Sequence, residues 1–259
     1  MCLIIVGYMA NKDFPLVIAA NRDEQYDRPT EPSHFWPDNP NILAGKDLIA
    51  NGTWMGISRK GRFAAVTNGS QPAPDLKTGL SRGTLIVDFL NGNMSAKEYA
   101  LELSTRSNLF NSFHLIIYDG NSMWNLASQP TKIPSEARQL IPGIYGLSNA
   151  GIDSGWYKCA TGEEKMSIIL KKDDFEISNL IEVVSDRSLA PKSQLSSLGL
   201  TREEDSVLSA QFVSAGSYGT RCSTLLTIDS QQTAEWIEIS FDSSANSTET
   251  VKEKIRLET

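Results

Sequence analysis

Cys2 is the residue of this sequence with the clearest capacity for chemistry. Its side chain is small, so we expect Met1 to be removed, which leaves a thiol beside a free α-amine. An α-amine has an ordinary pKa of about 7.7–8.0, so much of it can accept a proton near neutral pH. The thiol and its own amine then form a nucleophile–base pair. The alternative is an incidental, inert cysteine; if Met1 is retained, the Cys2 nitrogen is an amide and cannot be the base.

A charged block, Asn21-Arg22-Asp23-Glu24, directly follows an apolar stretch that is typical of a buried strand. The Arg22 guanidinium is always charged and could stabilise a thiolate or an anionic ligand. Asp23 could orient the Cys2 amine, and Asn21 could contribute to ligand binding. A solvated turn with local ion pairs would explain the same four residues without any site.

Three further residues stand at the ends of predicted strands. Asn68 and Asn149 each close a short apolar segment. An amide at a strand end can donate to a developing oxyanion, although asparagine is also a common turn former. Arg221 begins a strand and could bind a substrate carboxylate or Asp23, or take part in a structural salt bridge.

Other common catalytic motifs are missing from the sequence. The two histidines, His34 and His114, do not have the spacing of metal ligands, so no metal site is predicted. A phosphate loop, a dinucleotide fingerprint and a Gly-x-Ser-x-Gly elbow are all absent. Of the three cysteines, Cys159 and Cys222 fall on the core faces of predicted elements. The predicted nucleophile is therefore Cys2.

Composition limits the classes of function. The 259 residues carry a formal net charge of -7, which argues against a nucleic-acid-binding surface. No segment approaches the roughly 20 apolar residues of a membrane span, and the apolar start of the chain lacks the basic region of a signal peptide. An odd number of cysteines without metal-like spacing predicts a reduced, cytoplasmic protein.

The elements that must position these residues are mostly strands. We expect a hairpin from residues 2–8 and 16–20, turning through 11–13, because both segments are apolar and the turn is polar. Ser95 and Glu98 have the spacing of a capping box at the start of a helix. Further strands are predicted at 54–58, 63–67, 113–118, 123–126, 144–147, 211–214, 222–228 and 235–241, and further helices around 156–160 and 177–184.

This order of elements predicts an α+β fold, with two mostly antiparallel sheets and helices outside them. Residues 27–46, which are rich in proline, glycine and polar residues, are predicted to form a long surface loop. A single domain is expected over residues 1–242. The polar residues 243–259 are expected to form a frayed tail.

The order of several motifs resembles the NRDE family, also called the transport and Golgi organisation protein 2 family. The similarity runs from residue 1 to about residue 242. Its motifs in this sequence are Met1-Cys2, Asn21-Arg22-Asp23-Glu24 with Arg28-Pro29, Trp54-Met55-Gly56 with Phe63, Val66-Thr67-Asn68, Gly146-Leu147-Ser148-Asn149 and Tyr218-Gly219-Thr220-Arg221-Cys222-Ser223-Thr224. The four-residue block is weak alone, whereas Met1-Cys2 followed by these five blocks in this order is specific.

The family is similar to the cysteine-dependent N-terminal nucleophile hydrolases, and this resemblance implies a four-layer αββα sandwich. It implies that Cys2 is the nucleophile of amide hydrolysis, that Arg22 and Asp23 support it, and that Arg221 holds the far side of the site. Asn68 and Asn149 would help to form the oxyanion site. In those hydrolases two residues separate the arginine from the aspartate, whereas here they are adjacent, so both cannot occupy the hydrolase positions.

The resemblance also implies a binding function. Members of the family are associated with haem trafficking and with lipid or acyl-CoA metabolism. The same cleft could hold a carboxylate-bearing ligand such as haem or an acyl-CoA against Arg22 and Arg221. No cofactor is required for catalysis, but Cys2, His34 or a methionine could ligate haem iron. A third interpretation is a scaffold that has lost its site and binds a partner through its surface.

Overall fold

The structure is a computed structural model, which describes residues 2–69, 79–129, 132–172, 174–196, 200 and 203–258. Its contacts divide the chain into two compact units. The first comprises Met1–Arg28 and Pro142–Lys254, and the second comprises Pro29–Ile141 and Ile255–Thr259. Each unit is built around one antiparallel sheet with helices, which confirms the predicted α+β class.

The first unit contains an eight-stranded sheet. Its strands lie in the order β11-β10-β1-β2-β13-β14-β15, and β12 pairs with β13. They span Leu3–Tyr8 (β1), Leu16–Gln25 (β2), Gly143–Ser148 (β10), Gly151–Ile152 (β11), Ser214–Ala215 (β12), Tyr218–Ile228 (β13), Thr233–Phe241 (β14) and Ser247–Arg256 (β15). The predicted hairpin of β1 and β2 is therefore confirmed, and it lies in the middle of this sheet.

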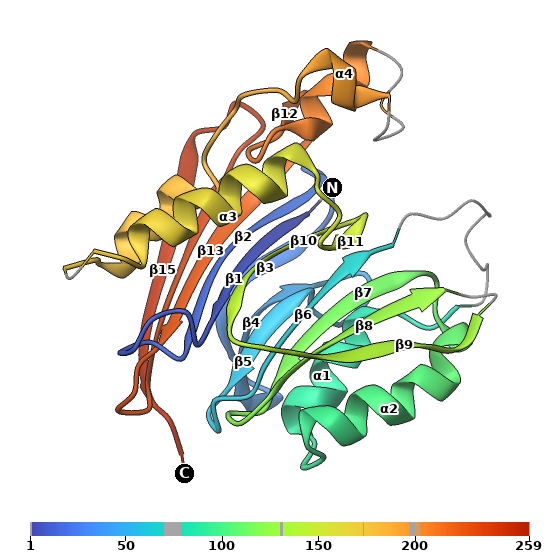
Figure 1. The fold of residues 1–259 in the computed structure, drawn as a ribbon, viewed down its shortest axis with the longest axis vertical. Helices are drawn as coiled ribbons and strands as arrows, with labels where there is room; N and C mark the ends of the chain where they lie inside the picture. The colour runs from blue at the N-terminus through green and yellow to red at the C-terminus, as the bar shows by residue number, and fades with distance from the viewer. Residues whose placement is uncertain are drawn as a thin grey trace. The chain divides into compact units, whose positions relative to one another are not determined.

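One face of this sheet is covered by helices. Figure 1 shows α3 (Tyr157–Ile169) lying along the strands of the first unit. Alternate residues of β1 and β2, such as Leu3, Ile5 and Val17, pack with α3 and with the 3-10 helix η2 (Ile177–Val183) in one apolar core. Because side chains alternate along a strand, the residues between them face the other side of the sheet. The remaining helical segments of the unit are α4 (Lys192–Leu195) and the 3-10 helix η3 (Glu203–Ser209).

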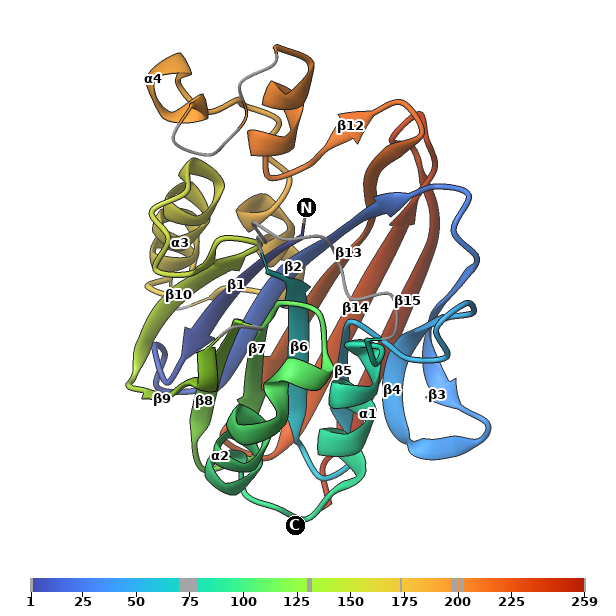
Figure 2. The same cartoon turned by 90° about the vertical axis from the view of Figure 1, so that its right-hand side faces the viewer.

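The second unit contains a seven-stranded sheet whose strands are neighbours in chain order, β3 to β9. They span Thr30–Trp36 (β3), Asn39–Asp47 (β4), Met55–Ser58 (β5), Phe63–Asn68 (β6), Phe113–Tyr118 (β7), Met123–Gln129 (β8) and Lys132–Leu140 (β9). Between β6 and β7 the chain forms α1 (Gly83–Asn91), α2 (Ala96–Arg106) and the 3-10 helix η1 (Ser107–Leu109). Figure 2 shows α1 and α2 beside β5, β6 and β7. Side chains of α1, α2, β6 and β7 pack in one apolar core.

The capping box predicted at the start of α2 is present. The Ser95 hydroxyl accepts a hydrogen bond from the Glu98 amide, and the Glu98 carboxylate accepts one from the Ser95 amide. This pairing satisfies backbone donors that the first turn of a helix leaves without an intrahelical partner. Across the described residues, no helix is long and apolar enough to cross a membrane.

The prediction of a long surface loop over residues 27–46 is wrong. These residues form the β3–β4 hairpin, in which Trp36, Leu43 and Ala44 are buried. The prolines misled the prediction, since proline cannot donate to a strand ladder. Proline is tolerated on edge strands, and β3 is the edge of its sheet.

The prediction of a frayed tail is also wrong. Residues 247–256 form β15, which lies beside β14 at the edge of the first unit's sheet. Its burial alternates, with Val251 and Glu253 partly buried and Ile255 fully buried. Charged residues between them face solvent, which is how natural proteins protect an edge strand from pairing with other chains. The polar composition therefore marked an edge strand.

Candidate functional site

The strand register of the first unit places Cys2 at one end of the sheet, between two neighbouring strands. Leu3 on β1 pairs with Asn21 on β2 and with Ser148 on β10. Continuing the same antiparallel register by one residue brings Cys2 beside Arg22 on one side and beside the residue after Ser148 on the other. Met1 lies outside the described residues, so its removal stays a prediction.

The Cys2 thiol is partly buried and lies against the backbone of Asp23. Its Sγ is 3.9 Å from the Asp23 carbonyl oxygen, which also accepts a hydrogen bond of 3.2 Å from the Tyr218 hydroxyl. Burial raises the pKa of the Cys2 thiol, with smaller effects from nearby charges including Asp23 and Arg22. The thiol is therefore protonated at neutral pH, and it needs a base before it can act as a nucleophile.

Arg22 and Asp23 reach this region from opposite faces of β2. The predicted charged block is part of the strand itself, and Asn21, Arg22 and Asp23 are all buried. A solvated turn is thus not what these residues form. The side chain of Asp23 faces the helices, and the side chain of Arg22 faces the other side of the sheet. Because Leu3 faces the helices, the alternation along the strand places the side chain of Cys2 on the same side as Arg22. Adjacent positions can therefore both act on Cys2, one from each face of the sheet.

The Asp23 carboxylate is held by two other elements. Its Oδ1 accepts a hydrogen bond of 2.7 Å from the Thr220 hydroxyl, and Thr220 in turn accepts one from the Val213 amide. Its Oδ2 lies 3.9 Å from the Nζ of Lys158, in the first turn of α3. The side chains of Asp23 and Lys158 are both 0% exposed. This is an ion pair shielded from solvent, and its carboxylate belongs to the residue whose carbonyl oxygen faces the Cys2 thiol.

Asn21 is part of the scaffold of this site. It is completely buried, and its Nδ2 donates hydrogen bonds of 2.8 Å to the carbonyls of Val184 and Gln211. Its Oδ1 accepts a hydrogen bond of 2.6 Å from the Ser223 hydroxyl. These bonds tie β2 to the end of η2, to the segment before β12, and to β13. An amide used in this way positions strands, and the predicted role of Asn21 in ligand binding stays a prediction.

Arg221 occupies a bulge in β13, where the pairing with β2 shifts register between Thr220 and Cys222. Its guanidinium donates hydrogen bonds of 2.8 and 2.9 Å to the carbonyls of Gln25 and Arg28. Arg221 therefore holds the turn after β2. These contacts fit a structural role better than the binding of Asp23 or of a substrate carboxylate.

This placement predicts the effect of replacing Arg221 with methionine. We expect the variant to lose about 2 kcal/mol of unfolding free energy, because two hydrogen bonds from a charged group are removed. The rate of alkylation of Cys2 should stay within about twofold of the native rate. Chemical denaturation and timed alkylation measure the two quantities. A stable variant with a much slower Cys2 would show that Arg221 belongs to the reactive site.

The two asparagines lie in different units. Asn149 directly follows Ser148 at the end of β10 and is partly buried, so the register places it beside Cys2. Asn68 is the last residue of β6 in the second unit. The residues that the first unit gathers are thus Cys2, Arg22, Asp23 and Asn149, whereas Asn68 is not one of them. The oxyanion roles of both asparagines stay predictions.

Sequence reasoning missed Lys158, Thr220 as a partner of Asp23, and Tyr218. A lysine in the first turn of a helix normally suggests a solvent-exposed residue, and nothing in its neighbours indicates burial. Tyr218 and Thr220 belong to the motif that runs from Tyr218 to Thr224, and membership of that motif was the only indication in the sequence that they could contribute to the site. Their contact with Asp23 depends on the pairing of β2 with β13, which no local pattern encodes.

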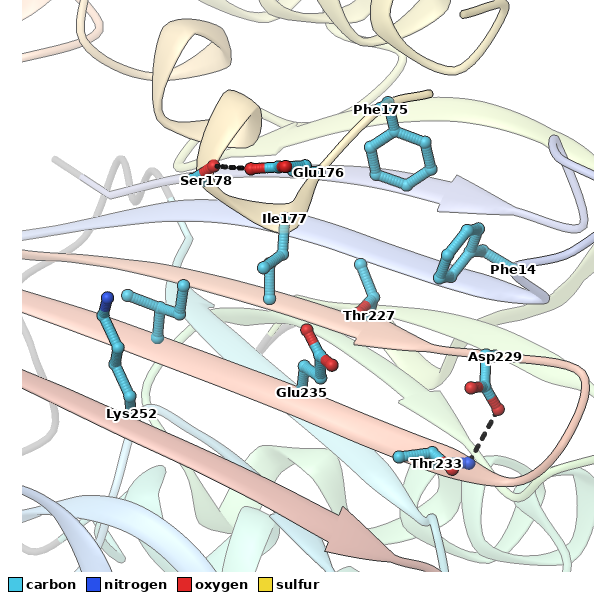
Figure 3. Close-up of a pocket in the computed structure, with 11 residues that line it drawn as sticks. Phe14, Phe175, Glu176, Ile177, Ser178, Thr227, Asp229, Thr233, Glu235 and Lys252 are labelled. Atoms are coloured by element: carbon cyan, nitrogen blue, oxygen red, sulfur yellow. Dashed lines mark hydrogen bonds between the residues drawn. The ribbon is translucent and has the colours of Figure 1, made fainter. Parts of the chain in front are cut away.

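A separate hollow of about 530 Å³ lies in the first unit, between the start of η2 and strands β13, β14 and β15 (Figure 3). Phe14 and Phe175 meet edge to face on its wall. Its carboxylates already have partners: Asp229 accepts hydrogen bonds from its own turn, and Glu235 pairs with Lys254. The predicted site residues are not among those that line it, so we do not include it in the site.

Comparison with known proteins supports the resemblance that the motifs indicated. The family model described as "Transport and Golgi organisation 2" matches residues 1–243. A mouse protein named "Transport and Golgi organization 2 homolog" is 31% identical over 249 residues, which cover 88% of this chain and 89% of the mouse protein. The human "Transport and Golgi organization protein 2 homolog" is 31% identical over 252 residues, with the same coverage.

A solved structure shares the fold. It is that of the Caenorhabditis elegans ortholog of N-acylethanolamine-hydrolyzing acid amidase, with a TM-score of 0.52 and 14% sequence identity. The similarity covers 87% of this chain and 92% of the nematode protein. The chain therefore has a fold of the N-terminal nucleophile hydrolase type, as predicted.

Proposed function

This chain belongs to the Transport and Golgi organisation 2 family, and from that premise we propose that it hydrolyses a linear amide through an acyl-Cys2 intermediate. The observation that carries the proposal is the partly buried Cys2 thiol, 3.9 Å from the carbonyl of Asp23 and adjacent to Arg22 in the sheet. The proposal requires that Met1 is removed, so that Cys2 carries a free α-amine.

The chemistry follows from the state of the thiol. Because burial keeps the thiol protonated, the α-amine must take its proton as Sγ attacks the carbonyl carbon of the amide. A carbon–sulfur bond forms, and the carbonyl oxygen becomes an oxyanion. The ammonium then gives its proton to the leaving nitrogen as the carbon–nitrogen bond breaks. Water attacks the thioester with the amine again as base, and the acid leaves while the thiol is restored.

The neighbouring residues have distinct proposed roles. Arg22 places a buried cation on the Cys2 side of β2, where it would stabilise negative charge as it forms. Asp23, fixed by Thr220, would hold the α-amine in place for proton transfer. Asn149 would donate to the oxyanion from the neighbouring strand end. We expect the protein to work in a reducing compartment such as the cytoplasm, with its thiols free.

The fold supports the choice of an amide as the substrate class. The nematode structure that shares it is the ortholog of an amidase named for hydrolysing N-acylethanolamines. At 14% identity only the fold carries over, so we propose the bond type and leave the acyl and amine groups open. A panel of N-acylethanolamines and N-acyl amino acids is the natural set of first substrates.

The experiment that tests the proposal is intact-mass measurement after brief treatment with limiting iodoacetamide. We expect loss of one methionine and a single fast adduct on Cys2, because Cys2 is partly exposed, whereas Cys159 and Cys222 are buried. The panel of amides would then be assayed for release of the acid. Retained methionine, or a Cys2 that reacts no faster than Cys159, would contradict the proposal.

One observation supports a second candidate function, the binding of haem or an acyl-CoA without turnover. The buried Arg22 offers a cation beside Cys2, which could bind a ligand carboxylate. In a haem titration followed by absorbance, we expect Arg22→Met to weaken binding at least about tenfold, and Arg221→Met to change it little. Equal binding by both variants and the native chain would contradict this candidate. His34 is an unfavourable iron ligand because Pro32 and Glu31 already lie against its ring nitrogens.

A further inference from the structure

The buried Lys158 has no role in the mechanism above, yet its position is costly. Its side chain is 0% exposed, and removing an ammonium group from water costs several kcal/mol unless it is paired. It also lies in the first turn of α3, where the helix dipole disfavours a positive charge. Its Nζ is 3.9 Å from the Asp23 carboxylate and 5.9 Å from the centre of the Trp156 ring. A cation held this close to Asp23 in a site shielded from water acts strongly on that carboxylate.

The carboxylate that Lys158 faces is the one assigned to the Cys2 amine. Asp23 uses Oδ1 to accept the Thr220 hydroxyl and turns Oδ2 towards Lys158. The same residue presents its carbonyl oxygen to the Cys2 thiol. Two cations, the ammonium of Lys158 and the α-amine of Cys2 when protonated, would thus share a single carboxylate.

Such sharing changes which form of the amine is favoured. A carboxylate alone favours a protonated amine, and an ammonium ion cannot accept a proton from a thiol. A second cation on the same carboxylate opposes protonation of the amine, so the amine remains available as a base. We propose that Lys158 is a positioning residue that shares the Asp23 carboxylate with the α-amine of Cys2 and keeps that amine unprotonated at neutral pH. This inference rests on the proposed nucleophile–base pair at Cys2.

The titratable groups around the pair come from three elements. Some of them would also act on the amine, but they are present in every variant described below. The charged groups are Arg22 and Glu24 on β2. Tyr218 and Cys222 on β13 and Cys159 on α3 also lie nearby, and burial raises the pKa of each, so they are neutral at neutral pH.

The test measures the protonation of the amine directly and needs no turnover. The full chain is prepared with residue 2 as its first residue, as intact mass confirms, and carries Cys2→Ser so that no thiol competes. The rate of acetylation of the α-amine by trace acetic anhydride is followed from about pH 5 to 10 by mass spectrometry of the N-terminal peptide. With Lys158 present, the midpoint should lie at or below the ordinary value of about 7.7–8.0.

Adding Lys158→Met should raise that midpoint by about 1 or more, because Asp23 then acts on the amine without a competing cation. Lys158→Arg should return it towards the value found with lysine, since the charge is restored. Equal midpoints in the lysine and methionine chains would overturn the proposal, because a purely structural lysine would not alter the titration of the amine.

A second pair of variants covers the case in which Lys158→Met fails to fold. Asp23→Asn leaves the ammonium of Lys158 without a carboxylate and should lower the midpoint below 7.7–8.0. Adding Lys158→Met to that chain removes both charges and should raise the midpoint again; no difference between the two would also overturn the proposal. A shifted midpoint in a chain that never forms an acyl adduct would refute the hydrolase and leave this inference standing.

Discussion

Replacing Cys2 with alanine is expected to abolish capture of an activated acyl group as a thioester and to lower any amide turnover by at least about 10³-fold. The α-amine would remain and could be acylated, but the product would be an amide and not the thioester of the proposed mechanism. The midpoint of thermal unfolding should change little, because one partly buried sulfur atom is removed. Intact mass after exposure to a p-nitrophenyl ester, together with assay of acid release, measures both effects.

Cys222→Ala is the matched control for this experiment. Cys222 is also a free thiol, and it lies on the strand that pairs with Arg22, but it is only 8% exposed and burial raises its pKa well above the usual range. The control should keep the acyl adduct and most of the turnover. If Cys2→Ala kept them as well, the nucleophile would be elsewhere and the proposed mechanism would fail.

Replacing Asp23 with alanine should destabilise the protein by about 3–5 kcal/mol, whether or not the protein is an enzyme. The substitution leaves the ammonium of Lys158 buried without its counter-charge, and it removes the acceptor of the Thr220 hydroxyl. Unfolding in urea, followed by fluorescence, gives the free energy. The expected loss is a large part of the total stability of an ordinary domain.

An exposed ion pair provides the comparison. Glu235 pairs with Lys254 at the sheet edge, where both side chains are well exposed, so Glu235→Ala should cost less than about 1 kcal/mol. The double variant Asp23→Asn with Lys158→Met should recover much of the loss, because no charge is then left buried alone. A cost for Asp23→Ala as small as that for Glu235→Ala would mean that water reaches this pair.

The sequence predicted local features of the fold well. The apolar segments of β1 and β2 on either side of a polar turn indicated the hairpin, and Ser95 with Glu98 indicated the start of α2. These signals succeed because each depends on contacts within a few residues. The class of fold followed from the order of such elements.

Predictions from composition failed at the sheet edges. Residues 27–46 and the last strand contain the prolines, serines and charges that usually mark loops, yet the first segment contains the edge strand β3 and the second is the edge strand β15. An edge strand has a solvent-facing side and an unpaired backbone, so selection favours polar residues and proline there. The alternation of Val251, Glu253 and Ile255 was the only local sign of β15.

The site was predictable in its residue types but not in its partners. Cys2, Arg22 and Asp23 could be selected because a thiol beside an amine, and charges beside a buried strand, are unusual. That Asp23 contacts Lys158 and Thr220 depends on a helix and a strand far along the chain. Whether a charged side chain is exposed or buried is decided by this packing, so Lys158 carried no signal of its own.

The pairing of β2 with β13 has a consequence for the synthesis of the protein. Asp23 and Tyr218, which meet across this pair, are 195 residues apart. At about 5–20 residues per second, a ribosome needs roughly 10–40 s to make the chain between them. Until β13 is made, the β2 edge of the β1–β2 hairpin is unpaired, although β10 and α3 are made earlier. We expect an aminopeptidase to remove Met1 in that interval, before β13 completes the sheet around Cys2.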